Sequence, residues 1–355
     1  MEVGRDASFT SGPPQQSVDD EGKHSSVLEY LIIAVCAVGC LLNAYELFQF
    51  SRTLHRQSEK NPTTALLVNQ FSLDGFTCVF SVVCFSLRNS SIQFVGQTGS
   101  WLCGCFYSQT IVRIGLTGSA VNLVLIAVQL YVEIQHPVLY RKHFRMWMVW
   151  LAIVFAWIDG ILLNNNLTIP THIDRGDCYL DAIAGSRAGQ VAFGIFGFVW
   201  RHLLPVLVLV CCYLRLMFTV RQRCLASPGH ASSSSLQLHE QQHHQQHQED
   251  VTGPVSLLLV KAVETMALLS LFFIIAWSPA NIIQLYLMAA GRSLRFNLPT
   301  SIAMFVGLLN IASGPLIHIV SEGSSSKRLK IVEVHSLSTE QHVAESHNDM
   351  PDIVI

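Results

Sequence analysis

Seven separate apolar stretches are the feature that most constrains this chain of 355 residues. Each is about long enough to cross a hydrocarbon layer of ~30 Å as an α-helix. Because a bilayer core offers the backbone no water, spanning segments satisfy their own hydrogen bonds as helices. The stretches cover residues 28–50, 65–87, 106–132, 147–163, 191–218, 257–288 and 298–320. We predict an all-α integral membrane protein, a bundle of seven transmembrane helices.

Composition and charge placement support a membrane protein with a defined orientation. Hydrophobic residues make up 50% of the chain and charged residues only 13%, too few to cover a soluble protein of this size. Lys and Arg are more frequent in one set of connecting segments, such as those around Arg52, Arg141 and Lys327. Since basic flanks stay cytoplasmic, we expect the N-terminus outside and the C-terminus inside. We expect a multi-pass protein of the plasma membrane, surrounded by lipid and without a nucleic-acid partner.

This orientation divides the chain into three parts. We expect a polar extracellular tail at 1–26, a membrane domain at 27–320 and a cytoplasmic tail at 321–355. The third inner loop, about 221–253, is rich in Ser, Gln and His and has little to bury, so we expect it to be disordered. The C-terminal Ile-Val-Ile, ending at Ile355, could add as a strand to a PDZ-type groove.

Two modifications are expected on the outer side. Asn166 begins an Asn-Leu-Thr sequon in the second outer loop, so it is a candidate glycosylation site. Three cysteines, Cys103, Cys105 and Cys178, fall in this oxidising compartment. One bridge, most simply Cys105 to Cys178, would tie the second outer loop to the top of the third helix. Cys103 lies two residues away, and the sequence leaves the choice between them open.

The sixth stretch carries an unusual motif, Phe273 followed by Ala276-Trp277-Ser278-Pro279. It resembles the Phe-x-x-Cys-Trp-x-Pro signature of the rhodopsin-like (class A) G-protein-coupled receptors. Pro279 removes a backbone hydrogen bond and kinks the helix, and Trp277 precedes the bend, where a ligand could press on it. A kinked helix with a buried Trp can also be packing alone.

Further residues carry the same resemblance, which covers about 28–320. The family's paired polar anchors are matched by Asn43 and Asp74, its helix-three serine by Ser119 and its helix-four tryptophan by Trp157. Its helix-five pair is matched by Pro205 and Tyr213, its bridging cysteine by Cys105 and the start of its second inner loop by His136-Pro137. The resemblance implies a seven-helix receptor in which Trp277, Pro279, Tyr213, Leu130 and His318 occupy the positions that switch between states.

Two departures from the family pattern affect the switch positions. Gln129-Leu130-Tyr131 stands where the family has Asp/Glu-Arg-Tyr, so no arginine is present to pair internally or to reach a G protein. Helix seven carries Gly314-Pro315-Leu316-Ile317-His318 in place of Asn-Pro-x-x-Tyr. An isolated membrane carboxylate needs partners, and the resemblance places Ser119 and Asn310 beside Asp74. We expect a polar, hydrated site that can hold Na⁺, the alternative being a protonated Asp74 that only bonds its neighbours.

Two arginines indicate the chemistry of the ligand. Arg113 is about 12 Å below Cys105, and Arg201 is about 15 Å into helix five. Guanidinium groups converging at this depth favour a carboxylate or phosphate, with His202 as a third contact and Trp277 below. We therefore expect a small acidic ligand. Alternatively, the arginines pair with protein acids such as Asp159 or Asp177.

Other ligand and function classes are less consistent with the sequence. Val112 occupies the position where the family's amine receptors have aspartate, and Leu308 the position of the retinal-bearing lysine, so we expect neither an amine at that anchor nor retinal. We expect no cofactor beyond Na⁺, and no motif indicates an enzyme. The expected function is G-protein-coupled signalling. The missing arginine leaves an alternative, a non-coupling receptor-like scavenger, scaffold or partner subunit; a transporter or channel would need a continuous polar path.

Overall fold

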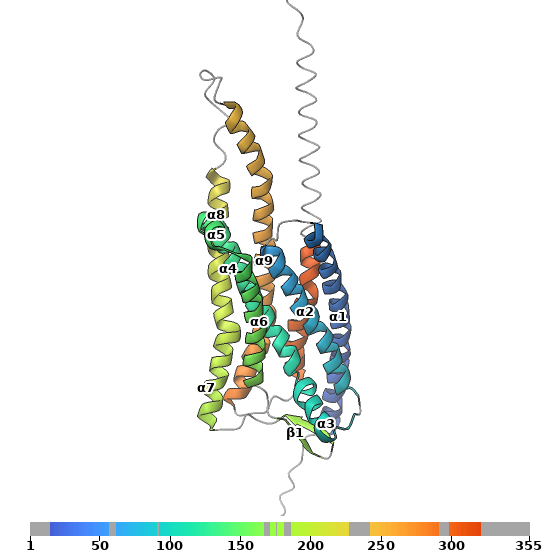
Figure 1. The fold of residues 1–355 in the computed structure, drawn as a ribbon. Coiled ribbons are helices and arrows are strands. Elements are labelled where there is room, and N and C mark those ends of the chain that lie inside the picture. The colour runs from blue at the N-terminus through green and yellow to red at the C-terminus, as the bar shows by residue number, and fades with distance from the viewer. Residues whose placement is uncertain are drawn as a thin grey trace, which may run out of the picture.

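The computed structural model shows a bundle of long helices that lie roughly side by side, with a small β-hairpin at one end (Figure 1). We call that end the hairpin end and the other the opposite end. The structure describes residues 15–56, 62–90, 92–166, 171–174, 176–180, 186–226, 242–290 and 298–320. Within these ranges some residues, including 15–26 and 242–262, are described by their backbone alone.

The prediction of a seven-helix bundle is confirmed. The described residues contain seven helical spans long and apolar enough to cross a membrane. The spans are Val27–Arg52, Pro62–Arg88, Gly96–Gln135, Met146–Asn164, Arg187–Thr219, Val263–Ala289 and Leu298–Val320. Each overlaps one of the apolar stretches, because hydropathy along the chain reports directly which segments can leave water.

Most spans are single helices, and two contain an irregular turn. The single helices are α1 (Gln15–Arg56), α2 (Pro62–Arg88), α6 (Met146–Asn166), α9 (Gln242–Ala289) and the helix Leu298–Val320, which we call helix seven. The third span joins α3 (Gly96–Leu102), the π-helical turn η1 (Cys103–Tyr107) and α4 (Thr110–Gln135). The fifth joins α7 (Arg187–Phe198), η2 (Val199–Leu203) and α8 (Leu204–Ala226). A short helix, α5 (Pro137–His143), follows α4 at the opposite end.

Strands β1 (Thr171–Asp174) and β2 (Asp177–Leu180) form an antiparallel hairpin in which Ile173 faces Cys178. Gly176, at the turn, has φ +92°, a conformation that glycine adopts without strain. The backbone N–H of Phe94 donates to the Gly176 carbonyl oxygen at 2.8 Å. The hairpin is thereby attached to the segment that precedes α3.

A disulfide joins Cys178 of the hairpin to Cys103, with their Cα atoms 5.7 Å apart. The prediction that Cys105 forms this bridge is wrong, and Cys105 is a free cysteine. That prediction counted back from residues 127–131 along a regular helix. The chain instead inserts a π-helical turn and one residue, Gln109, with left-handed backbone (φ 59°), so regular spacing fails above Thr110.

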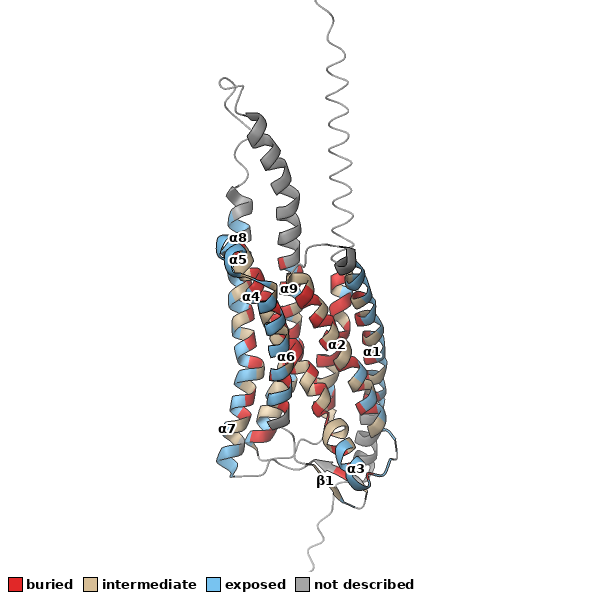
Figure 2. Ribbon diagram, in the orientation of Figure 1, coloured by how far each residue is buried: buried red, intermediate tan, exposed pale blue. Residues whose placement is uncertain are grey.

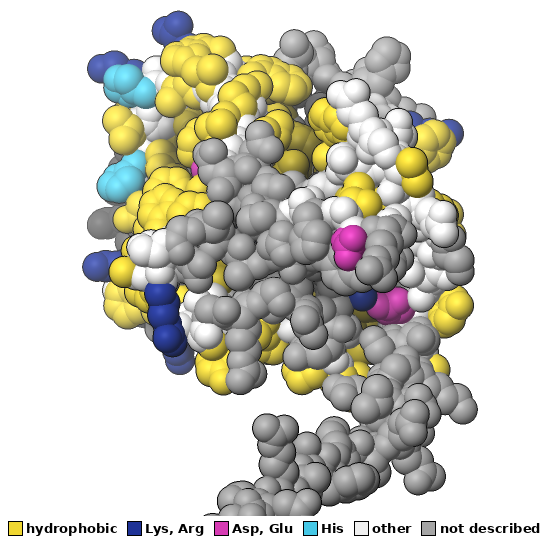
Figure 3. Space-filling view, turned by 90° about the horizontal axis from the view of Figure 1, so that it is seen from below, with side chains coloured by type: hydrophobic (Ala, Val, Ile, Leu, Met, Phe, Trp, Pro, Cys, Tyr) yellow, Lys and Arg dark blue, Asp and Glu magenta, His cyan; other side chains and the backbone are white. Residues whose placement is uncertain are grey.

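Burial separates the bundle into a core and a lipid-facing surface (Figure 2). Buried side chains lie where α2, α4 and helix seven face their neighbours. The outer faces of α1, α6 and α7 are largely exposed, with exposed residues such as Leu41, Trp150 and Phe196. Figure 3, a view onto the hairpin end, shows hydrophobic side chains around much of the visible margin. Exposed apolar surface of this extent is expected where lipid replaces water.

Glycines allow helices to approach closely at two places. A Cβ on Gly39 of α1 would lie 2.8 Å from the Cys78 sulfur and 3.1 Å from the Ala312 Cβ, so α1, α2 and helix seven meet there. A Cβ on Gly160 of α6 would lie 2.6 Å from the Ile114 carbonyl oxygen of α4. Small residues of this kind are typical of contacts between membrane helices.

The expected polar segments differ from the structure at their edges. Helix α1 begins at Gln15, within the expected tail 1–26, and α8 and α9 extend into both ends of the expected disordered loop, up to Ala226 and from Gln242. Residues 227–241 and the tail 321–355, with its expected PDZ motif, lie outside the described residues. Asn166 ends α6 and its side chain is not described, so glycosylation stays a prediction.

Candidate functional site

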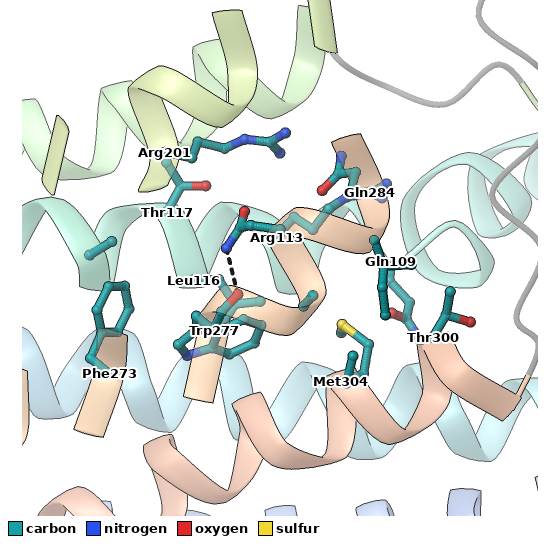
Figure 4. A pocket seen from close by; sticks show the side chains of 15 residues that line it. Gln109, Arg113, Leu116, Thr117, Arg201, Phe273, Trp277, Gln284, Thr300 and Met304 are labelled. Atoms are coloured by element: carbon teal, nitrogen blue, oxygen red, sulfur yellow. Dashed lines mark hydrogen bonds between the residues drawn. The ribbon is translucent and has the colours of Figure 1, made fainter. Parts of the chain in front are cut away.

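A cavity of about 120 Å³ lies among α4, η2, α9 and helix seven, toward the hairpin end (Figure 4). It includes three of the four residues expected to contact a ligand: Arg113, Arg201 and Trp277. Its lining consists of Gln109, Arg113, Leu116, Thr117, Ala120, Arg201, Phe273, Trp277, Ala280, Asn281, Ile283, Gln284, Thr300, Ala303 and Met304. The two arginines therefore share one cavity, as their matching depths predicted.

Arg113 reaches the cavity from the first turn of α4. One terminal nitrogen of its guanidinium donates to the Ser108 carbonyl oxygen at 2.8 Å and to the Thr110 hydroxyl at 3.4 Å. Ser108 and Thr110 flank Gln109, whose left-handed backbone separates η1 from α4. The irregular turn thus exposes a carbonyl oxygen that holds one edge of the guanidinium, and the other edge remains available to a ligand.

Arg201 belongs to η2, the π-helical turn of the fifth span. Its Nε donates to the Gly197 carbonyl oxygen at 3.2 Å. A Cβ on Gly197 would lie 3.0 Å from a terminal nitrogen of Arg201, so glycine makes room for the side chain to fold back along its own helix. Figure 4 shows the Arg113 and Arg201 side chains extending the same way, with Gln284 near their ends in this view.

Within the described residues, neither arginine forms an ion pair with a carboxylate. Asp159, one of the two acids expected as alternative partners, instead accepts a hydrogen bond from the Trp200 indole at 3.1 Å. The side chain of Asp177, the other acid, is outside the described residues. The described part of the chain therefore supports a pair of cations that face the cavity without an internal counter-charge.

Trp277 lies deeper in the cavity, where most of the lining is apolar. Leu116, Phe273 and Met304 lie around it (Figure 4). A Cβ on Gly307 of helix seven would lie 2.7 Å from the Trp277 ring, so the indole packs directly on backbone. Trp277 is 6% exposed and its indole N–H is buried without a hydrogen-bond partner. Its carbonyl oxygen accepts from the Asn281 amide at 2.9 Å, beside Pro279.

The structure places His202 outside this cavity. Its ring is 7% exposed, and Nε2 lies 3.0 Å from the Ser278 hydroxyl, which joins η2 to α9. His202 follows Arg201 directly, and neighbouring residues on a helix point about 100° apart. The expectation of a third ligand contact at His202 is therefore not supported by its position.

Gln109, Gln284 and Thr300 line the cavity but were not expected from the sequence. Gln109 is 2% exposed, and its amide nitrogen is buried without a partner. Gln109 precedes Arg113 by four residues, a spacing that would have suggested a shared helical face. The sequence around Gln284 and Thr300 gave no comparable indication of a site, because single Gln and Thr residues are common on membrane helices.

Asp74 of α2 lies in a polar network at the centre of the bundle. It accepts hydrogen bonds from the Ser119 hydroxyl at 2.7 Å and from the Gln70 amide at 3.1 Å. Asn310 faces the same small cavity of about 30 Å³ as Asp74 and Ser119. The three residues expected to form a Na⁺ site therefore meet. Gln70, which was not expected, already donates where a cation would bind.

The Gln70 amide connects this site to a longer chain of hydrogen bonds. The Asn122 side chain donates to the side-chain amide oxygen of Gln70 at 2.9 Å, and Asn69 donates to the side-chain amide oxygen of Asn122 at 2.8 Å. Trp157 of α6 donates to Asn69 at 3.0 Å. Helices α2, α4 and α6 are thus joined through buried side chains whose polar groups are paired, which favours one arrangement of these helices.

Leu130 is 2% exposed and packs in the core at the opposite end of α4. Its neighbour Gln129 replaces the family's acid and donates to Glu133 at 2.6 Å, to Thr63 at 2.9 Å and to Tyr140 of α5 at 3.2 Å. Burial, and then the nearby Glu133 carboxylate, raise the pKa of Tyr140 above its usual value. The neutral amide of Gln129 therefore joins α2, α4 and α5 at the opposite end of the bundle, where no arginine takes part.

His318 ends helix seven where the family has tyrosine. Its Nδ1 lies 3.5 Å from a carboxylate oxygen of Glu46 in α1, and both side chains are buried. The ring contacts Phe50 and Phe71, with centroids 5.3 Å and 5.7 Å away. A long acidic side chain near the end of a span can extend to the headgroups, but Glu46 does not. It is 2% exposed and pairs inside the bundle.

The fifth span contributes the remaining switch position. Tyr213 is 7% exposed and belongs to the main hydrophobic core. Leu209 and Leu216, on the same helix, are completely buried in that core. Tyr213 therefore faces the bundle interior and does not face lipid.

Comparison with known proteins gives a consistent result. The model of the 7 transmembrane receptor (rhodopsin family) matches residues 47–318. Similar proteins include the tyramine receptor Ser-2 of Caenorhabditis elegans, 25% identical over 58% of this chain and 43% of the relative. The C3a anaphylatoxin chemotactic receptor of Oncorhynchus mykiss is 23% identical over 56% of each chain, and the rhodopsin of Aquarana catesbeiana is 22% identical over 59% and 58%. The chain spans about half the length of the curated relatives it matches.

Proposed function

Because the chain belongs to the rhodopsin family of seven-transmembrane receptors, we propose that it is a G-protein-coupled receptor. It receives a small acidic ligand from outside the cell and signals to a heterotrimeric G protein. Its membership of a receptor family confirms the prediction that the chain is not an enzyme. The hairpin end, with its disulfide, faces the oxidising exterior of the plasma membrane, and the opposite end faces the cytoplasm.

The observation that carries the ligand class is the pair Arg113 and Arg201 in one cavity. Both guanidinium groups face it, and neither has a carboxylate partner among the described residues. A buried charge without a partner is costly, so a site of this kind stabilises a ligand of opposite charge. Carboxylate and phosphate oxygens fit guanidinium donors best.

Ligand binding is coupled to the opposite end through the sixth span. The ligand presses on Trp277, which packs on Gly307 and precedes Pro279. Displacement of the ring changes the kink at Pro279, and α9 moves at its cytoplasmic end. A ligand shifts such an equilibrium only by binding one arrangement more tightly than the other.

The experiment is a screen of small organic acids in cells that express the chain with a panel of G proteins. Arg113→Ala and Arg201→Ala are compared with the parent, and Arg187→Ala, whose exposed side chain lies outside the cavity, is the matched control. We expect loss of potency of roughly tenfold or more in the two cavity variants only. Unchanged potency in both would refute the acidic ligand.

Leu130 supports a second candidate, a receptor-like scavenger, scaffold or partner subunit that does not couple to G proteins. It is buried where the family has an arginine, so that arginine's contact with a G protein is missing. Replacing Leu130 with Arg separates the candidates. Gain of G-protein signalling would indicate that the native chain is uncoupled. Loss of existing signalling would indicate coupling through other contacts.

A further inference from the structure

Two of the polar side chains that line the cavity are cationic, and a third presents a donor without a partner. Arg113 and Arg201 bring two guanidinium groups, and Gln109 brings a buried amide nitrogen without a partner. Figure 4 shows the two arginines extending toward the side on which Gln109 lies. No Asp or Glu is among the described residues that line the cavity. This region therefore requires a ligand that supplies acceptor oxygens and negative charge.

The two guanidinium groups require more than one negative charge. Arg113 and Arg201 carry like charges and line the same cavity, so they repel each other. A single carboxylate leaves one unit of positive charge uncompensated between two partly buried guanidinium groups, where unpaired charge is costly. A ligand with two negative charges on one small group compensates both.

The opposite part of the cavity is apolar. Leu116 and Ala120 of α4, Phe273 of α9 and Met304 of helix seven surround the Trp277 ring. Apart from the Trp277 indole N–H, these side chains offer no hydrogen bonds to a polar group, so this part favours hydrocarbon. The whole cavity, including its polar region, measures about 120 Å³, less than the roughly 150 Å³ of an apolar cavity that accepts a benzene molecule. The hydrocarbon part is therefore short.

We propose that the ligand is a small amphiphile with a compact, doubly negative head and a short apolar tail. The head lies between Arg113 and Arg201, with Gln109 donating to one of its oxygens, and the tail lies on Trp277. The proposal rests on the proposed function of the cavity as a ligand site. Phosphate monoesters and geminal dicarboxylates share this chemistry.

Three acids with similar tails test the proposal on the purified full chain in detergent. Butyl phosphate and butylmalonate carry two charges near pH 7.5, and pentanoate carries one. We expect both dianions to bind roughly tenfold or more tightly than pentanoate. Methyl phosphate, which keeps the head and lacks the tail, binds more weakly than butyl phosphate. A difference between the two dianions identifies which head the site prefers.

The ratio of dianion to monoanion affinity within each variant is the deciding measurement, because it is insensitive to partial loss of folded protein. In Arg113→Gln and in Arg201→Gln, each with one guanidinium left, we expect this ratio to fall to within about twofold. In Arg187→Gln, an exposed arginine outside the cavity, it stays at the parental value. Asp177→Asn tests an internal counter-charge, and we expect it to leave the ratio unchanged.

Several outcomes would overturn the proposal. Pentanoate binding as tightly as the dianions, a parental ratio in either cavity variant, or no binding of any acid at millimolar concentration would each exclude a dianionic head. A large rise of anion affinity in Asp177→Asn would show that the protein supplies the missing charge itself. If the monoanion and the dianions bind equally tightly and binding still depends on both arginines, the proposed acidic ligand stands and only the dianionic head is excluded. If neutral pentanamide binds as tightly as every acid, the dianionic head and the acidic ligand are both excluded.

Discussion

The two ends of the bundle treat buried charge in opposite ways. Toward the hairpin end, Arg113 and Arg201 face a cavity and have no carboxylate partner among the described residues. Toward the opposite end, Glu46 and His318 are buried as a pair, and Gln129 donates to three neighbours. Polar groups that pair internally hold helices together, whereas charges left unpaired store a cost that a ligand can relieve. Substitutions at the two ends should therefore have opposite effects on stability.

The largest effect is expected at the Glu46–His318 pair. His318→Phe keeps a ring against Phe50 and Phe71 but leaves Glu46 buried without its partner. The expected loss of unfolding free energy is on the order of 3 kcal/mol, measured by denaturation of the purified chain in detergent. Glu46→Leu combined with His318→Phe removes both partners and should recover much of that loss. Losses that simply add would argue against the pair.

The disulfide is expected to contribute slightly less. Cys103→Ser opens the bridge to Cys178 and should lower the unfolding free energy by about 2–4 kcal/mol. Cys105→Ser, two residues away and not bonded, is the matched control and should change it by less than ~0.5 kcal/mol. Thiol labelling under denaturing conditions identifies the bridged pair. A larger loss from Cys105→Ser would restore the pairing first expected from the sequence.

The centre of the bundle should respond more weakly and depend on sodium. Gln70→Ala removes the amide that donates to Asp74 and to Ser119, with an expected loss of about 1–3 kcal/mol. Because the amide occupies the place of a cation, replacing Na⁺ with choline should affect this variant more than the parent. Melting temperatures in the two salts provide the measurement. Equal sodium dependence in both proteins would mean that Gln70 does not compete with the ion.

The smallest effect, and the one that reverses sign, is expected at the cavity. Without ligand, Arg201→Met removes a charge that has no carboxylate partner in the described part of the chain and keeps similar side-chain volume. We expect unfolding free energy to stay the same or to rise by about 1 kcal/mol, measured as above. A loss as large as that of His318→Phe would mean that Arg201 is paired within the protein, and the contrast between the two ends would disappear.

Hydropathy was sufficient to predict the seven spans, because membrane insertion depends on local apolar length. The convergence of Arg113 and Arg201 on one cavity was also predictable, since both depths could be counted along the helices. Trp277 was identified from its motif. These features depend on sequence position alone, and the structure places each of them as expected.

The remaining features depend on local backbone irregularity or on helix rotation. The π-helical turn and the left-handed Gln109 shift the register above Thr110, so counting selected Cys105 where Cys103 forms the bridge. The sequence does not specify which face of α1 turns toward helix seven, so the burial of Glu46 beside His318 was not predicted. The contacts of Gln70 with Asp74 and of His202 with Ser278 were not predicted for the same reason.

The bare backbone at Gly307 has a mechanical consequence for whatever occupies the cavity. At Gly307 no side chain separates the Trp277 indole from the backbone of helix seven, so a push in that direction meets the main chain directly. A shift of a few tenths of an ångström must be taken up by the main chain of one helix or the other. Displacement of the Trp277 ring toward Gly307 therefore moves the sixth and seventh spans together, because the ring and the backbone are in direct contact.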